Sequence, residues 1–171
     1  GTVVEMGPGV RIKVAGRLTV LGTDAQPVTI RSIVATQRHE GIEFNITSNG
    51  RGSNLEHLDI IQSWFGITIY DSNPTISNLT INNPDYVGID IFGGSPILND
   101  ITIQDGGQGV HTISTHWRYG LGISIGAQAA PFVNRVRIDN VMTRGLNLWG
   151  GAGGMISNVN ITNTTGATQA I

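Results

Sequence analysis

The sequence predicts an all-β fold, a parallel β-solenoid, because it contains a repeat of twenty-odd residues made of short strands and turns. The repeat is clearest in residues 66–81, where three alternating apolar runs are separated by turns rich in Asn, Ser, Asp and Pro. Such runs are typical of strands, and no stretch of this segment has helical periodicity. A period of this length built from three strands is typical of a parallel solenoid.

Two columns of the sequence define the period. The first is a leading glycine with intervals of 25, 22, 34 and 23 residues, found at Gly41, Gly66, Gly88, Gly122 and Gly145. The second is an apolar position with intervals of 21, 22, 35 and 23 residues, found at Leu58, Leu79, Ile101, Val136 and Val159. Because the two columns advance together, they define the same repeating unit.

Each repeat predicts three strands and two turns. The leading Gly-Ile-x-Ile forms the first strand, and the second and third strands are separated by a dipeptide turn at 56–57, 77–78, 99–100, 134–135 and 157–158. Four of these dipeptides contain Asn, which favours a ladder of side chains between coils. Alternation directs about five aliphatic side chains per repeat inward, each worth about 1.5–3 kcal/mol when buried.

The first forty residues carry a more specific pattern. Residues 8–32 run from Pro-Gly-Val through an alternating strand to Gly-Arg-Leu-Thr-Val, Gly-Thr and Pro-Val-Thr-Ile-Arg-Ser. This order resembles the first coils of pectin-lyase-like domains found on large secreted and cell-surface proteins. The resemblance implies a right-handed single-stranded parallel β-helix of about seven coils of three short strands, outside the cell or on its surface. It implies little about activity, because that superfamily holds lyases, hydrolases, epimerases and modules without known chemistry.

The repeat predicts one β-helix segment over residues 1–171, with opening coils at 1–40, repeat coils at 41–171 and a loop insertion at 105–121. The pattern is already running at residues 10–14 and restarts at 166–171, so we expect a segment of a longer protein. A net charge of −2 without a basic stripe argues against nucleic-acid binding. The absence of cysteine excludes disulfides, and no apolar run is long enough for a membrane span.

Two regions are candidate binding sites. The outward column of the first strand holds Glu43, Thr68, Asp90, Ser124 and Asn147, and two residues further along an aromatic stripe holds Tyr70, Phe92 and Trp149, interrupted at Gly126. The loop insertion adds His111, His116, Trp117, Arg118 and Tyr119. Aromatic faces beside carboxylates and amides suit sugar rings, so we expect carbohydrate binding by Tyr70, Phe92, Trp149, Asp90, Asn147, Trp117 and Tyr119. The alternative is that the loop covers Phe92 and Trp149, with its own aromatic residues as filling.

A catalytic set is the second hypothesis. Glu43 and Asp90 lie two coils apart on one face, roughly 9–10 Å, near the upper end of the spacing in inverting glycosidases. His116 and Arg118 from the loop complete the candidate set for a polysaccharide lyase or glycoside hydrolase. The Asn-Thr-Asp, Asp-Asp and Gly-His-Gly motifs of pectin hydrolases are absent.

The sequence predicts no cofactor. Its aspartates are scattered over turns, which leaves calcium unmotivated, and two histidines five residues apart make a weak metal site. Asn45, Asn160 and Asn163 begin glycosylation sequons. We therefore expect an extracellular structural or adhesive module whose partners are a polysaccharide or glycan, or neighbouring modules and copies of the same surface protein.

Overall fold

A computed structural model describes residues 1–108 and 119–164 of the chain, and in these residues the fold is all-β. The strands are β1 (Val3–Met6), β2 (Ile12–Val14), β3 (Thr19–Leu21), β4 (Val28–Ser32), β5 (Ile42–Phe44), β6 (Asn54–Ile61), β7 (Phe65–Tyr70), β8 (Thr75–Asn82), β9 (Val87–Phe92), β10 (Ile97–Gln104), β11 (Leu121–Gly126), β12 (Phe132–Asp139), β13 (Arg144–Leu148) and β14 (Met155–Thr162). A single 3-10 turn, Ile46–Ser48, is the helical segment of this described part. It is far too short to cross a membrane, and no other described segment is a helix that could do so.

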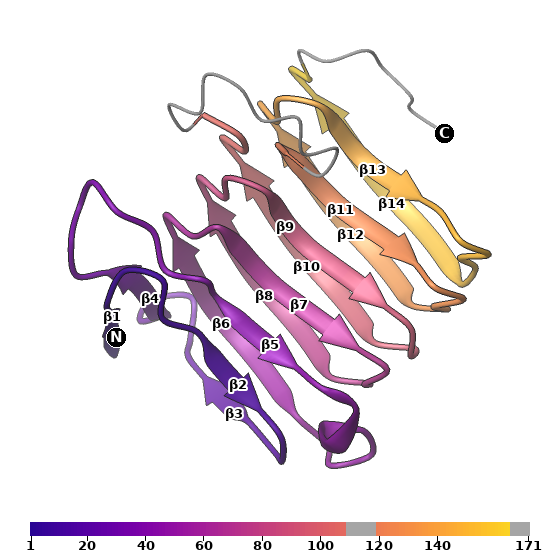
Figure 1. The fold of residues 1–171 in the computed structure, drawn as a ribbon, viewed down its shortest axis with the longest axis horizontal. Helices are drawn as coiled ribbons and strands as arrows, with labels where there is room; N and C mark the ends of the chain where they lie inside the picture. The colour runs from indigo at the N-terminus through magenta and orange to yellow at the C-terminus, as the bar shows by residue number, and fades with distance from the viewer. Residues whose placement is uncertain (109–118, 165–171) are drawn as a thin grey trace.

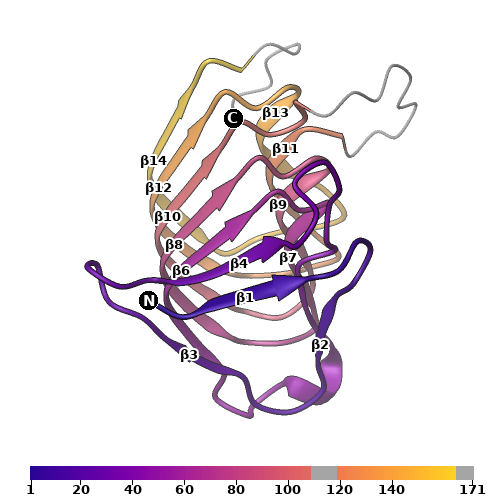
Figure 2. The same ribbon diagram turned by 90° about the vertical axis from the view of Figure 1, so that its left-hand side faces the viewer.

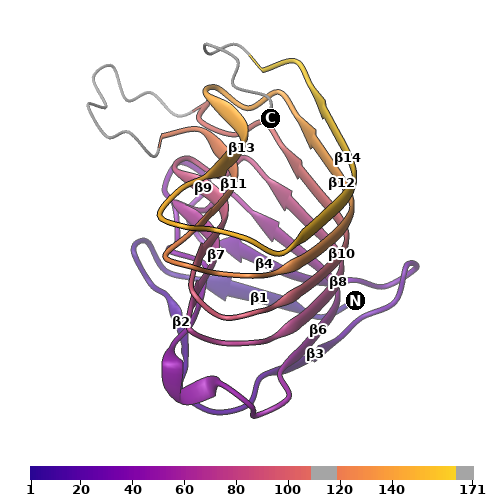
Figure 3. The same ribbon diagram turned by 90° about the vertical axis from the view of Figure 1, so that its right-hand side faces the viewer.

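The strands form two parallel sheets that face each other across the interior (Figures 1, 2 and 3). One has six strands in the order β13-β11-β9-β7-β5-β2. The other has eight strands in the order β1-β4-β6-β8-β10-β12-β14, with β3 also pairing with β6. From β5 onward the chain passes from one sheet to the other and back, so successive passes stack from the N-terminus to the C-terminus. This arrangement is compatible with the predicted solenoid.

The pairing register confirms the repeat. In the six-stranded sheet the register partners are Ile42, Ile67, Ile89, Ile123 and Leu146, each following a leading glycine. In the eight-stranded sheet they are Leu58, Leu79, Ile101, Val136 and Val159. Both columns of the sequence therefore correspond to columns of stacked side chains in the structure.

The prediction of three short strands per coil is wrong from β6 onward, because the second and third runs form one eight-residue strand. The dipeptide turn is a bend inside that strand, and its second residue has positive φ in every copy, at His57, Asn78, Asp100, Arg135 and Asn158. One left-handed residue redirects a strand without ending its ladder. In the opening coil, residues 22–27 separate β3 from β4, so three strands are present there.

The aliphatic columns pack between the sheets as predicted. Ile67, Ile69, Ile76, Leu79 and Ile81 of one coil are each at most 1% exposed. Leu148 differs, with 38% exposure, because β13 is the edge strand of its sheet and no further described strand covers it.

The leading glycines are required because a side chain at these positions would clash with neighbouring atoms. A Cβ on Gly88 would lie 2.7 Å from the carbonyl oxygen of Gly122 and 2.8 Å from two methyl carbons of Ile103. Real side chains do not approach so closely, so the first strand can sit this near the third run of its coil only without a Cβ.

Candidate functional site

The polar column of the six-stranded sheet has the predicted order. Glu43 is in register with Thr68, Thr68 with Asp90, Asp90 with Ser124, and Ser124 with Asn147. The structure differs from the expectation in how far these side chains are covered, because exposure is 9% for Glu43, 1% for Asp90 and 0% for Ser124. Neighbouring strands only about 4.8 Å apart bring the side chains of this column against one another, with Thr68 and Ser124 on either side of Asp90. Most of this polar column is therefore covered by other side chains and is not an exposed row on the surface.

Glu43 is held by cations of the adjacent strand. Arg11 forms ion pairs with both Glu43 and Glu40, and Lys13 Nζ lies 3.8 Å from Glu43 Oε1. These contacts hold the Glu43 carboxylate against β2. Asp90 lies two strands away in the same column, about 9–10 Å by strand spacing, so the geometry keeps the two carboxylates in line and apart.

The aromatic stripe is a continuous surface. The rings of Tyr70 and Phe92 stack with their centroids 4.8 Å apart and an interplanar angle of 13°. The rings of Phe92 and Trp149 meet edge to face, with centroids 5.9 Å apart and an angle of 79°. Tyr70 is 39% exposed, and Phe92 and Trp149 are half-buried. Together Tyr70, Phe92 and Trp149 form the surface that we call the aromatic face.

Gly126 is what allows this continuity. The sequence suggests that Gly126 interrupts the stripe, but a Cβ at Gly126 would overlap the six-membered ring of the Trp149 indole. The indole therefore lies over Gly126 and spans the strand that lacks a side chain. Its Nε1 donates a hydrogen bond to Ser124 Oγ at 3.2 Å. Beside it, Arg144 Nη1 donates to Asn147 Oδ1 at 3.4 Å.

The predicted loop insertion at 105–121 falls between β10, which ends at Gln104, and β11, which begins at Leu121 and so includes the last residue of the predicted range. His111, His116, Trp117 and Arg118 lie outside the described residues. Tyr119 is described, and it is 7% exposed with its hydroxyl donating to the carbonyl oxygen of Gly107 at 2.7 Å. Burial, with the nearby Asp85 carboxylate, raises the pKa of Tyr119. Tyr119 is thus packed inside a turn and is not part of the aromatic face.

A buried polar cluster adjoins Tyr119. Arg38 Nε lies 3.8 Å from Asp85 Oδ2, and the Arg38 guanidinium donates two hydrogen bonds to Asn83 at 2.6 and 3.0 Å. The same guanidinium lies 6.0 Å from the ring centroid of Trp64, which stacks on Tyr86 at 5.1 Å. These contacts join the turns that precede successive strands of the six-stranded sheet. Sequence reasoning missed this cluster, because nothing in the repeat marks Arg38 as a partner of Asp85.

His39, Ser63 and Asp85 lie on adjacent turns, and these residue types form hydrolytic triads in enzymes. The hydrogen bonds exclude that role for His39. Its Nδ1 accepts from the Gly41 amide at 3.0 Å, and its Nε2 lies 3.1 Å from the carbonyl oxygen of Ile61. Burial lowers the pKa of His39, which keeps the ring neutral with its proton on Nε2. His39 therefore satisfies backbone groups and does not activate a hydroxyl.

The sequon asparagines differ in their surroundings. Asn45 is half-buried, and its Oδ1 accepts from the Thr47 amide at 3.0 Å to cap the 3-10 turn. Asn160 and Asn163 are exposed, and Asn163 Nδ2 donates to Asp139 Oδ1 at 2.7 Å. For metals, residues 1–108 and 119–164 hold no group of three or more His, Asp or Glu side chains that could bind an ion.

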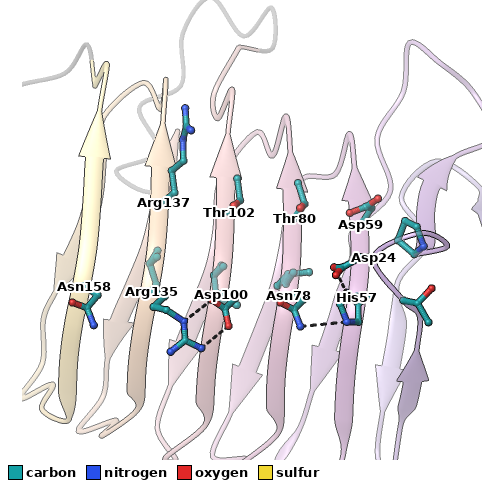
Figure 4. A pocket seen from close by; sticks show the side chains of 15 residues that line it. Asp24, His57, Asp59, Asn78, Thr80, Asp100, Thr102, Arg135, Arg137 and Asn158 are labelled. Carbon is teal, nitrogen blue, oxygen red and sulfur yellow. Dashed lines mark hydrogen bonds and ion pairs between the residues drawn. The ribbon is translucent and has the colours of Figure 1, made fainter.

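Sequence reasoning also missed a groove on the outer face of the eight-stranded sheet (Figure 4). Its volume is about 580 Å³, and polar side chains of five neighbouring strands line it. The bend residues form one wall, and we call it the bend row: His57, Asn78, Asp100, Arg135 and Asn158. The dipeptide column of the sequence marks this wall, although the sequence alone predicts only a structural ladder there. Hydrogen bonds from Asn134 Nδ2 to Asn99 Oδ1 at 3.3 Å and from Ser157 Oγ to Asn134 Oδ1 at 3.1 Å support that interpretation for the first residues of the last three dipeptides.

Comparison of the chain with protein-family models, with curated proteins and with solved structures finds no match. Its function is therefore argued from its own geometry.

Proposed function

We propose that this chain is a right-handed parallel β-helix module of the pectin-lyase-like type. In this proposal it serves as a rigid structural or adhesive element outside the cell and binds carbohydrate on its aromatic face. The handedness, the superfamily and the extracellular location rest on the pattern of residues 8–32. The two parallel sheets and their register are compatible with them.

The observation that carries the binding proposal is the continuity of the aromatic face. Three rings from β7, β9 and the end of β13 are in contact, and they span four strands because Trp149 covers the strand of Gly126. A surface several strands wide can accept several sugar rings in a row, stacking on their C–H faces. The exposed Asp71 carboxylate follows Tyr70 and supplies acceptors for hydroxyl groups at the edge, whereas the Asn73 amide is already bonded to the Ser95 amide and to Asn49.

Rigidity follows from the packing. The core is a stack of apolar columns, mostly Ile, Leu and Val, and from β5 onward each pass of the chain is paired to its neighbours along both sheets. Neighbour-only packing of this kind lets a module be lengthened by adding coils, which suits a stalk or spacer.

The test is binding of the purified segment to a panel of neutral and acidic polysaccharides, with Tyr70→Ala and Trp149→Ala as variants. Each variant should weaken binding at least about tenfold, the effect expected of an aromatic side chain central to an interface. Phe132→Ala is the matched control, because Phe132 is an aromatic residue with 38% exposure on the other sheet. Binding that neither Tyr70→Ala nor Trp149→Ala weakens would overturn carbohydrate binding by the aromatic face.

The same panel separates binding from catalysis. Release of reducing ends or of unsaturated products, abolished by Asp90→Asn, would replace the binding module by the polysaccharide lyase or glycoside hydrolase alternative. Binding without turnover is the outcome that we expect.

A further inference from the structure

We propose that the groove on the eight-stranded sheet is a second saccharide site, which holds an extended chain of about four neutral sugar units across the strands. This site lies on the opposite sheet from the aromatic face and shares no residue with it. The inference therefore stands independently of the function proposed above.

The groove has two polar walls. The first is the bend row, and the second is made by outward side chains two positions further along each strand, at Asp59, Thr80, Thr102 and Arg137 (Figure 4). The positive φ of each bend residue turns the strand, so both walls face the same space. Between them the floor is formed at Leu79, Ile101 and Val136, whose side chains point into the core.

The first wall is held in place by its own contacts. Arg135 donates from Nε and Nη2 to the two carboxylate oxygens of Asp100, both at 2.6 Å. His57 Nδ1 lies 3.0 Å from Asp24 Oδ1, and Asn78 Nδ2 lies 3.4 Å from His57 Nε2. Thr23, Asp24 and Pro27 line the groove at this end, and Asn158 of β14 lines it at the other end of the described strands. Prearranged side chains lose little conformational entropy on binding a ligand.

The dimensions suit a linear chain. Five strands line the groove, and with a spacing of about 4.8 Å the four intervals give a length of roughly 19 Å. Its volume of about 580 Å³ lies within the range of small-ligand sites. A sugar unit of an extended polysaccharide is about as long as one strand interval, so each unit meets a similar pair of wall residues.

The lining favours hydroxyl groups over a peptide. The walls offer carboxylates, amides, hydroxyls and guanidinium groups, which both donate and accept hydrogen bonds. Among the described residues, no Phe, Tyr or Trp side chain lines the groove. The floor strands β8, β10 and β12 are each paired on both sides, so a peptide strand cannot add to the sheet along the floor of the groove.

Charge further favours a neutral ligand. Asp59 and Asp24 give the closed end a negative character, while the guanidinium groups of Arg135 and Arg137 are each paired with an aspartate. Three aspartates against two arginines line the groove, so it presents no excess positive charge to a uronate or sulfate. An acidic polysaccharide would lose its hydration without gaining a counter-charge.

The experiment is NMR titration of the 15N-labelled chain with β-1,4-linked glucose oligomers of two to six units, and with tetragalacturonate as the acidic probe. We expect shifts of the Thr80 and Thr102 amides, an affinity that rises with length up to four units and then levels off, and weaker binding of tetragalacturonate. The double variant Asp100→Ala/Arg135→Ala should weaken tetramer binding about tenfold, and removing both partners leaves no unmatched charge.

The matched control is Glu5→Ala/Arg31→Ala, which removes a similar exposed ion pair of 2.7 Å on the same sheet, between β1 and β4 outside the groove. This control and Trp149→Ala should leave the Thr80 and Thr102 shifts unchanged. No shift of these amides with any oligomer, equal binding by the groove variant, or stronger binding of tetragalacturonate would overturn the inference. Oligosaccharide binding that is lost in Trp149→Ala and kept in the groove variant would also overturn the inference. That result would support binding at the aromatic face instead.

Discussion

Gly126→Ala tests whether the aromatic face depends on the missing side chain beneath Trp149. The added Cβ would overlap the indole, so Trp149 has to leave its position over β11. The displacement breaks the edge-to-face contact with Phe92 and the hydrogen bond from Nε1 to Ser124. It thus separates the two ends of the surface without removing an aromatic ring.

The size of the effect follows from these two contacts. An aromatic pair contributes about 0.5–1.5 kcal/mol and a hydrogen bond a further 0.5–1.5 kcal/mol. Replacing glycine by alanine returns about 0.4–1 kcal/mol through the unfolded state. We therefore expect the free energy of unfolding to fall by about 1–2 kcal/mol. Each kcal/mol corresponds to a decrease in Tm of about 2–4 °C for a chain of this size.

Urea unfolding measures the loss of stability, and tryptophan emission reports the ring itself. The chain has three tryptophans, so the Trp149 signal is obtained by difference from Trp149→Phe in each background. Its emission should shift to longer wavelength, and polysaccharide binding should weaken. Gly153→Ala is the control, because a Cβ there meets no atom within 4 Å. Unchanged Trp149 emission together with unchanged or higher stability would refute the explanation given for Gly126.

Three further predictions address the scaffold and the groove. Gly88→Ala should lower the free energy of unfolding by about 1–3 kcal/mol in urea titrations through overpacking, whereas Gly16→Ala, in open space, should not lower it. Burial lowers the pKa of His39 in the folded chain, so below about pH 6.5 the unfolded chain binds this proton more readily and stability should fall as pH drops through this value. In His39→Gln this part of the pH dependence should vanish from thermal melts at pH 5–7. The double variant Asp100→Arg/Arg135→Asp should keep the Tm of the ligand-free protein in the same melts. The exposed ion pair is retained in this variant with its two residues exchanged.

The register could be predicted from the sequence because parallel strands that pair at a regular interval along the chain convert a linear period directly into stacking. Ile67 lies next to Ile89 in space for the same reason that the two are 22 residues apart in the chain. The sequence locates the bend within each repeat but does not predict the backbone conformation of the bend residue. Asn78 and Asn158 are common in the left-handed region, whereas Arg135 in the same conformation carries no such signal.

The sequence does not predict the contacts between side chains of neighbouring strands. Alternation correctly separates Thr68 and Asp90 from the core columns, but it cannot tell that side chains on adjacent strands shield Asp90 down to 1% exposure. The ion pairs of Glu43 with Arg11 and Lys13 join the opening coil to the repeat, and the repeat does not extend to those cations. Tyr119 was grouped with a surface loop although it fills a turn.

Gly126 shows how an exception in a repeat can carry more information than its consensus. A stripe of outward aromatic residues with one gap was predicted as an interrupted surface, since each residue was assigned only to its own strand. A tryptophan is long enough to reach the neighbouring strand, and its neighbour is the single position of the stripe with no side chain. The pairing of a large residue with an adjacent glycine therefore predicts a side chain that leans across the sheet. In a solenoid this reasoning turns a gap in a column into a continuous face, which is the property that a polysaccharide-binding surface needs.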